Sequence, residues 1–162
     1  MSIKASASVQ VAAANSGAIY AQMLAGATKP INICAITVVT RTGVPTEIGL
    51  VRSHSVGTAS AGNVATGIAQ RKPRQADIAG SVEVAWSTAP TGATGTHPYL
   101  RRQTIGGATG TRIELWRPEN GFISIEPTGV TGMGLLLLNV GSAPGAALDI
   151  HVDWEFGPAS DH

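Results

Sequence analysis

Strict alternation of apolar and polar residues at both ends of the chain is the strongest constraint on its fold. From Ile3 to Val11, every odd position is apolar and every even position is polar. The same pattern returns near the other end, where apolar residues alternate with Asp149, His151 and Asp153. A period of two places alternate side chains on opposite faces of a strand, whereas a helix would spread the acidic residues around its surface. The sequence therefore predicts a β-strand at each end, each with one buried face.

Between these ends lie short apolar stretches separated by turn residues such as Gly, Pro and Asn. Asn120 and Gly121 form a candidate tight hairpin turn, because both residues tolerate a positive φ. No segment keeps a helical period over three turns. Short strands with glycine-rich turns predict a single all-β domain of residues 1–162, an antiparallel β-sandwich that is jelly-roll-like. The internal strands are expected at 19–24, 31–41, 47–53, 81–87, 99–105, 112–116, 122–126 and 135–140.

Two segments fall outside this regular pattern. Residues 1–13 are expected to form an extended N-terminal segment, and residues from about 54 to 80 a long loop. Part of that loop, residues 63–70, fits either a strand or a short helix. The loop also carries Arg71, Lys72 and Arg74, which belong either to a solvated loop or to a docking element for an acidic strip on a neighbouring subunit.

The composition restricts the possible functions. Of the 162 residues, 43% are hydrophobic and only 13% are charged, against about 25% charged residues in an ordinary soluble domain. So little charge leaves part of the surface to be buried against other chains. A net charge of +1 argues against binding to nucleic acid through its phosphates. The longest aliphatic run, Leu135–Leu138, is too short to span a membrane, and the start of the chain lacks a signal-peptide pattern, so we expect cytoplasmic synthesis.

Motifs of catalysis and cofactor binding are absent from the sequence. There is no Gly-x-Ser-x-Gly elbow, and the glycine-rich segment 106–110 lacks the Lys-Ser/Thr of a phosphate loop. Cys34 is the single cysteine, so no intramolecular disulfide can form, and its apolar neighbours predict a small buried side chain. None of the four histidines has the spacing of a metal motif. We therefore expect no enzyme activity, no cofactor and no metal.

Three further groups of residues are candidates for contacts. Asp149, His151 and Asp153 share one strand face, which is either a polar strip facing solvent or a partner, or a source of ligands shared with another chain. Trp86 and Trp154 share the parity of apolar neighbours and are expected in the core. Trp116 shares parity with charged residues instead, which favours an edge, an interface or a sugar-stacking surface. Arg101 and Arg102 point to opposite faces, so one is expected to form an ion pair.

The C-terminal half carries a set of segments that resembles a known group of proteins. They are Tyr99–Arg102 (YLRR), Ile113–Pro118 (IELWRP), Phe122–Pro127 (FISIEP), Gly134–Gly141 (GLLLLNVG) and Ala147–Phe156 (ALDIHVDWEF). Together with the strand and loop pattern of the first part of the chain, they resemble small virion structural proteins of tailed bacteriophages. The closest resemblance is to capsid decoration (cement) proteins built on a jelly-roll-like sandwich. Residues 57–80 do not match that family.

This resemblance implies a protein that forms a homotrimer on the outer capsid surface of the virion. It would be synthesised in the bacterial host cytoplasm, and its partners would be the major capsid protein and other copies of itself. The alternatives are a tail or fibre component, a carbohydrate-binding β-sandwich module and a small hydrolase. We assign the partner contacts, as a hypothesis, to Ser2, Ile3, Lys4, Arg71, Lys72, Arg74, Trp116, Asp149, His151 and Asp153.

Overall fold

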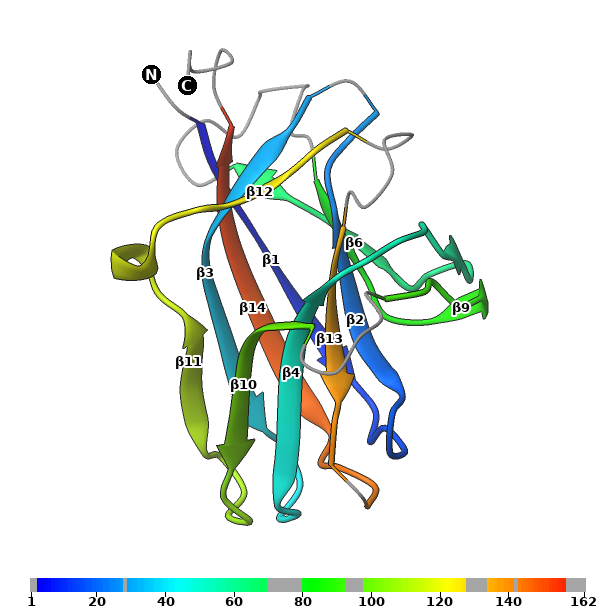
Figure 1. Ribbon diagram of the computed structural model, residues 1–162, viewed down its shortest axis with the longest axis vertical. Coiled ribbons are helices and arrows are strands. Elements are labelled where there is room, and N and C mark those ends of the chain that lie inside the picture. The colour runs from blue at the N-terminus through cyan, green and yellow to red at the C-terminus, as the bar shows by residue number, and fades with distance from the viewer. Residues whose placement is uncertain are drawn as a thin grey trace.

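The protein is built almost entirely of β-strands, which confirms the predicted all-β class. Its computed structural model describes residues 3–27, 29–69, 80–92, 98–127, 134–141 and 143–156. Two antiparallel sheets pack face to face, and a small third sheet projects from one side of them (Figure 1). The predicted antiparallel β-sandwich is therefore confirmed.

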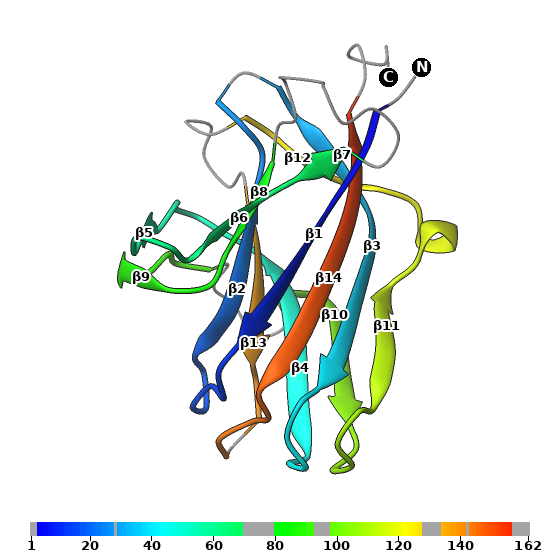
Figure 2. The same ribbon diagram turned by 180° about the vertical axis from the view of Figure 1, so that it is seen from behind.

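One sheet, which we call the β14 sheet, contains both terminal strands and faces the viewer in Figure 2. Its order is β11-β3-β14-β1-β7, and β12 also pairs with β3. Because β1 and β14 pair along their full length, the two ends of the chain leave the sheet side by side. The strands are β1 (Ile3–Val11), β3 (Ile31–Thr40), β7 (Ile68–Ala69), β11 (Arg112–Trp116), β12 (Ile123–Ile125) and β14 (Leu148–Phe156).

The second sheet, the β13 sheet, has the order β10-β4-β13-β2-β8-β6. The third is the β5–β9 arm, formed by β5 (Thr58–Ala59) and β9 (Trp86–Thr88). A short 3₁₀ helix, η1 (Pro118–Asn120), lies between β11 and β12. The strands of the β13 sheet are β2 (Ile19–Leu24), β4 (Thr46–Arg52), β6 (Val64–Thr66), β8 (Ser81–Glu83), β10 (Tyr99–Ile105) and β13 (Leu135–Asn139).

Apolar side chains of the two sheets meet to form the core. On β14 the alternation predicted from the sequence is confirmed, because Ile150, Val152 and Trp154 are buried while His151 is exposed. Gly80 packs against the Trp154 ring, and a Cβ at this position would lie 2.8 Å from its Cε2 atom. With a φ of +115°, position 80 favours glycine for its backbone conformation as well. Other large core side chains are Tyr20, Met23, Ile33, Ile36, Ile48, Leu50, Leu115, Ile125, Leu135 and Leu137.

The β13 sheet is also buried on part of its outer face, over β13, β2 and the end of β4, which explains its run of consecutive leucines. Leu135 and Leu137 point into the core, whereas Leu136 has the opposite parity and is fully buried beside Val51. Gly92 lies against this outer pair, since a Cβ there would lie 3.1 Å from Leu136 Cδ1 and 3.2 Å from Val51 Cγ2. A strand that is buried on both faces carries consecutive apolar residues and does not alternate apolar with polar ones.

Buried polar side chains hold the β5–β9 arm to this outer face. The Gln22 amide nitrogen donates to the carbonyl of Ser55 at 2.9 Å, and its oxygen accepts from the Gly57 N–H at 3.1 Å. The Trp86 indole N–H donates to the Glu83 carboxylate at 3.0 Å. Trp86 is only half-buried, so its predicted core position is wrong. The predicted strand 81–87 breaks after Glu83, where the chain leaves the β13 sheet and enters the arm.

The segment expected as a long loop from about 54 to 80 contains three short strands in its described part. β6 extends the β13 sheet through β8, and β7 extends the β14 sheet through β1. The segment 64–69 therefore passes from one sheet to the other and closes that side of the sandwich (Figure 2). The strand alternative for this stretch is confirmed over residues 64–69, and residues 70–79 lie outside the described part of the chain.

The expected hairpin at Asn120–Gly121 is wrong. β11 and β12 both pair with β3, so the chain continues along the same neighbour and does not reverse. Only Gly121 of the two residues has a positive φ, at 84°. The Trp116 indole N–H donates to the Gly121 carbonyl at 2.9 Å and fixes the detour between the two strands.

The N-terminal segment is not a free extension. Residues 3–11 form β1, which pairs with β14 along its length and with β7 at Ala5 and Ser6. Ala5 and Ala7 are buried in the core. Over residues 3–11 the expected extended segment is therefore a strand of the protein's own sheet.

Asn139 connects two loops at the end of the sandwich opposite the chain termini. Its buried amide nitrogen donates to the carbonyls of Ala14 at 2.9 Å and Ala143 at 3.0 Å, and its oxygen accepts from the Gly141 N–H at 3.0 Å. Nearby, the buried Tyr20 hydroxyl donates to the Ala146 carbonyl at 2.7 Å. One carboxamide thus satisfies backbone groups of both loops.

We expect Asn139→Ala to lower the free energy of unfolding by about 2–4 kcal/mol, because it removes three hydrogen bonds and leaves their backbone partners unpaired. Urea denaturation measures the change. The control is Asn120→Ala, on the exposed 3₁₀ helix, which should alter stability by less than about 0.5 kcal/mol. Equal effects of the two substitutions would contradict the role of Asn139.

Candidate partner-binding site

The outer face of the β14 sheet presents short polar side chains from neighbouring strands. The register places Ser8 of β1 opposite His151 of β14, His151 opposite Thr37 of β3, and Thr37 opposite Glu114 of β11. These residues lie on the solvent side because their neighbours along each strand point into the core. The face, which we call the polar face, is thus a continuous surface across four strands.

The acidic strip predicted from the sequence lies in the middle of this face. Asp149, His151 and Asp153 share one side of β14, with 47%, 46% and 33% of their side chains exposed. Arg41 lies 3.5 Å from Asp149, between Nε and Oδ1. The expected alignment of the three residues is confirmed. Arg41 was not predicted as the partner of Asp149, and it lies just beyond the end of β3.

Ser8, His151 and Asp153 form a hydrogen-bonded trio. Ser8 Oγ lies 2.6 Å from His151 Nδ1, and His151 Nε2 lies 3.1 Å from Asp153 Oδ1. A hydroxyl, an imidazole and a carboxylate in series are the parts of a nucleophilic triad. The trio was not predicted, since a single sequence does not reveal that Ser8 pairs with His151. The one hint in the sequence that these residues could meet was the alternation of apolar and polar residues in both terminal strands.

Among the described residues, the surroundings of this trio do not supply the rest of a hydrolase site. An acyl-transfer site also needs donors aimed at the developing oxyanion. β14 is a central strand, so its backbone N–H groups bond to β1 and β3 within the plane of the sheet. Ser8 and His151 are themselves exposed on an open surface. The geometry therefore orders the polar face and does not build a catalytic pocket.

We expect a fluorophosphonate probe to leave Ser8 unmodified, because no donor in the described part of the chain is placed to stabilise the charged intermediate. Intact-mass spectrometry measures the adduct, and hydrolysis of p-nitrophenyl acetate should be equal in the wild type and in Ser8→Ala. A Ser8 adduct that disappears in His151→Ala would show that the trio is catalytic after all.

The remaining predicted contact residues have different outcomes. Lys4 is exposed on β1 directly opposite Glu155, and the backbone of Ile3 pairs with that of Phe156 at the edge of the polar face. Trp116 ends the edge strand β11, as the edge prediction requires, but it packs partly against the core. The other predicted contacts, Ser2, Arg71, Lys72 and Arg74, lie outside the described residues.

Arg101 and Arg102 are both exposed, because β10 is the edge strand of its sheet. The expected ion pair is confirmed for Arg102, whose Nε lies 2.6 Å from Glu47 Oε1. Hydrogen bonding to Glu47 raises the pKa of the Arg102 guanidinium above its ordinary value. Arg102 also lies over the Tyr99 ring, 5.5 Å from its centroid, so the pair and the ring together hold this side chain on the β13 sheet.

Cys34 lies on β3 where the pairing with β14 shifts register. Its side chain is half-buried, so the expected buried position is only partly realised. The pKa of the Cys34 thiol is raised to about 11, mainly by burial and in addition by the nearby carboxylates of Glu155 and Asp153, while Lys4 opposes the rise. The thiolate is the reactive form of cysteine. Cys34 is therefore a poor nucleophile.

We expect Cys34 to react with 5,5′-dithiobis(2-nitrobenzoate) at pH 8 about a hundredfold more slowly in the folded protein than in urea, because a thiol pKa near 11 leaves little thiolate. Absorbance of the released thionitrobenzoate measures the rate. The double variant Asp153→Asn/Glu155→Gln should react faster than the wild type. Equal rates in buffer and urea would contradict the raised pKa.

Comparisons of the chain with protein-family models, with curated proteins and with solved structures give no match. Within the described ranges, no group of three or more His, Cys, Asp or Glu side chains is placed to hold a metal ion. In the same part of the chain, no helix has the length and apolar character needed to cross a membrane.

Proposed function

We propose that the protein is a non-catalytic structural component of a bacteriophage virion, a decoration protein that binds the outer surface of the capsid and stabilises the shell. Its partners in this proposal are the major capsid protein and other copies of the chain, which form a homotrimer. The polar face is the proposed contact surface. The observation that carries the proposal is the open and ordered polar face on one sheet, set against the partly covered outer face of the other sheet.

The size of the polar face suits an assembly with many weak contacts. With a rise of about 3.3 Å per residue and about 4.8 Å between strands, four strands of this length cover on the order of 600 Å². A stable interface between two proteins buries about 800 Å² on each partner. One face alone therefore supports a modest affinity. A trimer that engages several sites on a shell at once would gain affinity without any further contact.

The connectivity of the sandwich supports the jelly-roll part of the proposal. Eight long strands make up the two sheets, in the orders β11-β3-β14-β1 and β10-β4-β13-β2. Successive long strands mostly alternate between the sheets, and the first strand pairs with the last. Two interleaved Greek keys produce such an order, and viral capsid proteins are among those that use the jelly roll.

The charges on the polar face favour a protein partner with mixed charge. Acidic side chains of β14 lie beside Lys4 on β1 and Arg41 after β3. Exposed charges of both signs fix the register of a contact more than they strengthen it, and salt weakens their attraction. A tail or fibre module that binds glycans remains the alternative, with Trp116 as its aromatic platform. That platform is poorly placed, since the Trp116 ring packs partly on the core and its N–H is bonded.

We expect Ser8→Arg to abolish cosedimentation with capsid shells of the phage that encodes the chain, because a long cation would stand on the polar face beside His151. Pelleting of shells with bound protein measures the loss. Ser8 is exposed, so the variant should keep its fold. The matched control is Thr104→Arg, an exposed hydroxyl residue on β10 of the other sheet, which should bind as the wild type does.

Light scattering on a sizing column should give three times 16.5 kDa for the free protein if it is the proposed trimer. Equal binding of shells by the wild type and Ser8→Arg would refute the polar face as the contact. Binding of the wild type to host glycans and not to shells would favour the tail or fibre alternative.

A further inference from the structure

A cleft of about 440 Å³ opens between the edge strands of the two sheets. β10 borders it on the β13 sheet and β11 on the β14 sheet, at the side of the sandwich opposite the β5–β9 arm (Figure 1). We call it the edge cleft. Its lining consists of Arg101, Gln103, Arg112, Ile113, Glu114 and Arg117.

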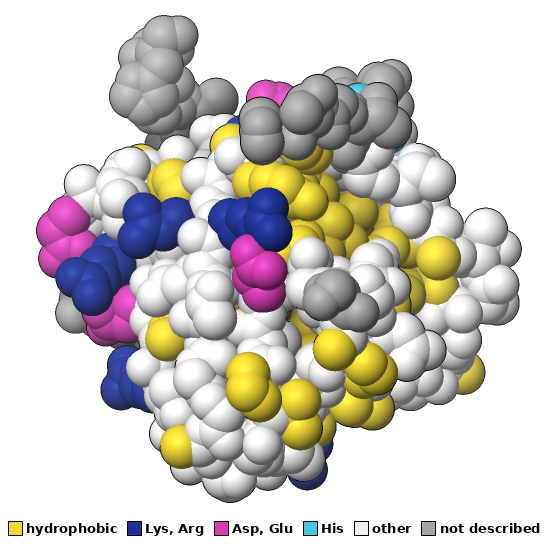
Figure 3. Space-filling model, turned by 60° about the horizontal axis from the view of Figure 1, so that its bottom comes forward, with side chains coloured by type: hydrophobic (Ala, Val, Ile, Leu, Met, Phe, Trp, Pro, Cys, Tyr) yellow, Lys and Arg dark blue, Asp and Glu magenta, His cyan; other side chains and the backbone are white. Residues whose placement is uncertain are grey.

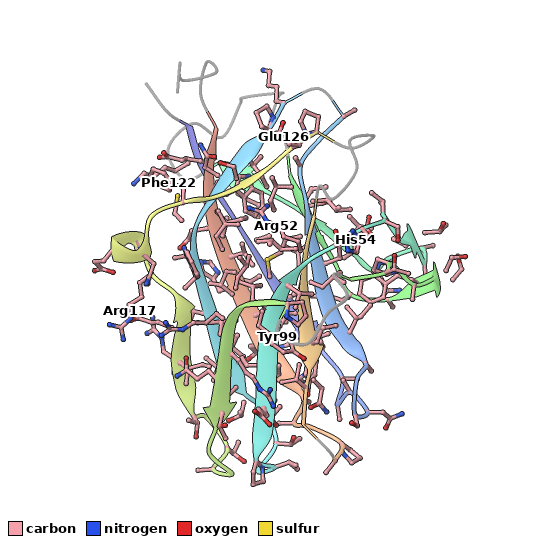
Figure 4. All side chains as sticks on the ribbon, in the orientation of Figure 1. Arg52, His54, Tyr99, Arg117, Phe122 and Glu126 are labelled. Carbon is pink, nitrogen blue, oxygen red and sulfur yellow. The ribbon has the colours of Figure 1, made fainter. Side chains whose placement is uncertain are left out.

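The edge cleft carries an excess of positive charge. Three arginine side chains line it, against the single carboxylate of Glu114, which lies 2.9 Å from Arg117 between Oε2 and Nε. Arg101 and Arg112 form no ion pair with any residue of the described ranges. Basic side chains gather on this side of the molecule in Figure 3, and Arg117 extends beyond the end of β11 in Figure 4.

Arg101 and Arg112 differ in this respect from the other arginines of the described residues. Arg41 has Asp149 at 3.5 Å, and Arg102 has Glu47 at 2.6 Å. The half-buried Arg52 donates to the Ser124 carbonyl (Figure 4). Guanidinium groups brought together without an anion repel one another. A planar guanidinium binds the two oxygens of a carboxylate or phosphate in a fork, so the cleft matches an oxyanion.

Gln103 places a second requirement on a ligand of the edge cleft. Its side-chain oxygen is buried and has no hydrogen-bond partner. Buried acceptors in folded proteins nearly always have a donor. Because Gln103 also lines the edge cleft, a ligand with a hydroxyl or N–H beside its acidic group would supply the missing donor.

We propose that the edge cleft is a binding site for a ligand that carries a carboxylate or phosphate group next to a hydrogen-bond donor. Arg101 and Arg112 bind the oxyanion, Arg117 adds positive charge while it holds Glu114 in place, and Gln103 accepts from the donor. The cleft shares Glu114 with the polar face, but Arg101 and Gln103 come from the other sheet, and binding of a small anion does not require the proposed function. Its volume is that of a small-molecule site.

Three small anions test the site by isothermal titration calorimetry on the full chain at low ionic strength. Citrate carries carboxylates and a hydroxyl, tricarballylate is the same skeleton without the hydroxyl, and inorganic phosphate represents the phosphate source. We expect citrate or phosphate to bind, and raising NaCl from about 20 to about 200 mM to weaken binding strongly. Tighter binding of citrate would assign the site to carboxylates, and tighter binding of phosphate to phosphates.

Matched double variants separate the edge cleft from general surface charge. Arg101→Gln/Arg112→Gln should weaken binding by at least about tenfold. Arg41→Gln/Arg102→Gln removes the same charge outside the cleft and should change affinity less than about twofold. Arg117→Gln gives an independent single change at the same site. Gln103→Leu should remove the preference for citrate over tricarballylate.

Two results would overturn the proposal. One is failure of the wild type to bind any of the three anions at low salt. The other is an equal loss of binding in the two double variants, which would show that the edge arginines serve only to keep exposed strand edges from pairing with other chains. Equal affinity of the wild type for citrate and tricarballylate would overturn the role of Gln103.

Discussion

The simultaneous pairing of β14 with β1 and β3 is the interaction on which the sandwich depends. β14 is the last strand of the chain, yet it occupies the centre of its sheet. The first strand reaches the sheet only through it, and β11 and β12 join through β3. Every partner of β14 is therefore distant in sequence. Long-range pairing of this kind requires closure of large loops before contacts form, which makes folding slow compared with helical proteins.

The outer faces of the two sheets differ in how they are separated from or adapted to water. The β13 sheet covers part of its outer face with its own chain, and Gln22 and Glu83 supply the polar contacts that attach the covering arm. The β14 sheet leaves its outer face to short polar side chains that bond to one another across strands. A chain with few charges thus concentrates a large share of its interactions with solvent on one sheet. This asymmetry is the physical basis for considering that sheet the surface that meets a partner.

Period-two alternation was sufficient to predict the strands that have one buried face. β1, β2, β10, β11 and β14 have the predicted bounds, because each carries a clear pattern or is bounded by turn residues. Prediction failed where the tertiary structure overrides local pattern. Trp86 shares parity with core residues, but the strand ends before it and the chain enters the arm. Asn120–Gly121 has the composition of a hairpin turn, but β3 offers partners to the strands on both sides of it.

The candidate sites also divide into features of a single strand, which could be predicted, and features that depend on which strands are neighbours. The alignment of Asp149, His151 and Asp153 is a property of one strand, so the sequence contained it. The contacts of Ser8 with His151 and of Arg41 with Asp149 depend on which strands are neighbours, and one sequence does not specify that. The edge cleft was the hardest feature to predict from the sequence, because it lies between the edges of two different sheets and exists only after they pack.

The adjacency of the first and last strands has a consequence for engineering. Ile3 and Phe156 are paired in register, so both chain ends leave the sandwich at the same pole and the Asn139 loops lie at the other. A peptide or domain fused to either end would project from one pole and leave the polar face and the edge cleft uncovered. A short linker between the ends would also allow circular permutation, with new termini in the exposed turn between β10 and β11. The fold is therefore a display scaffold with two equivalent attachment points.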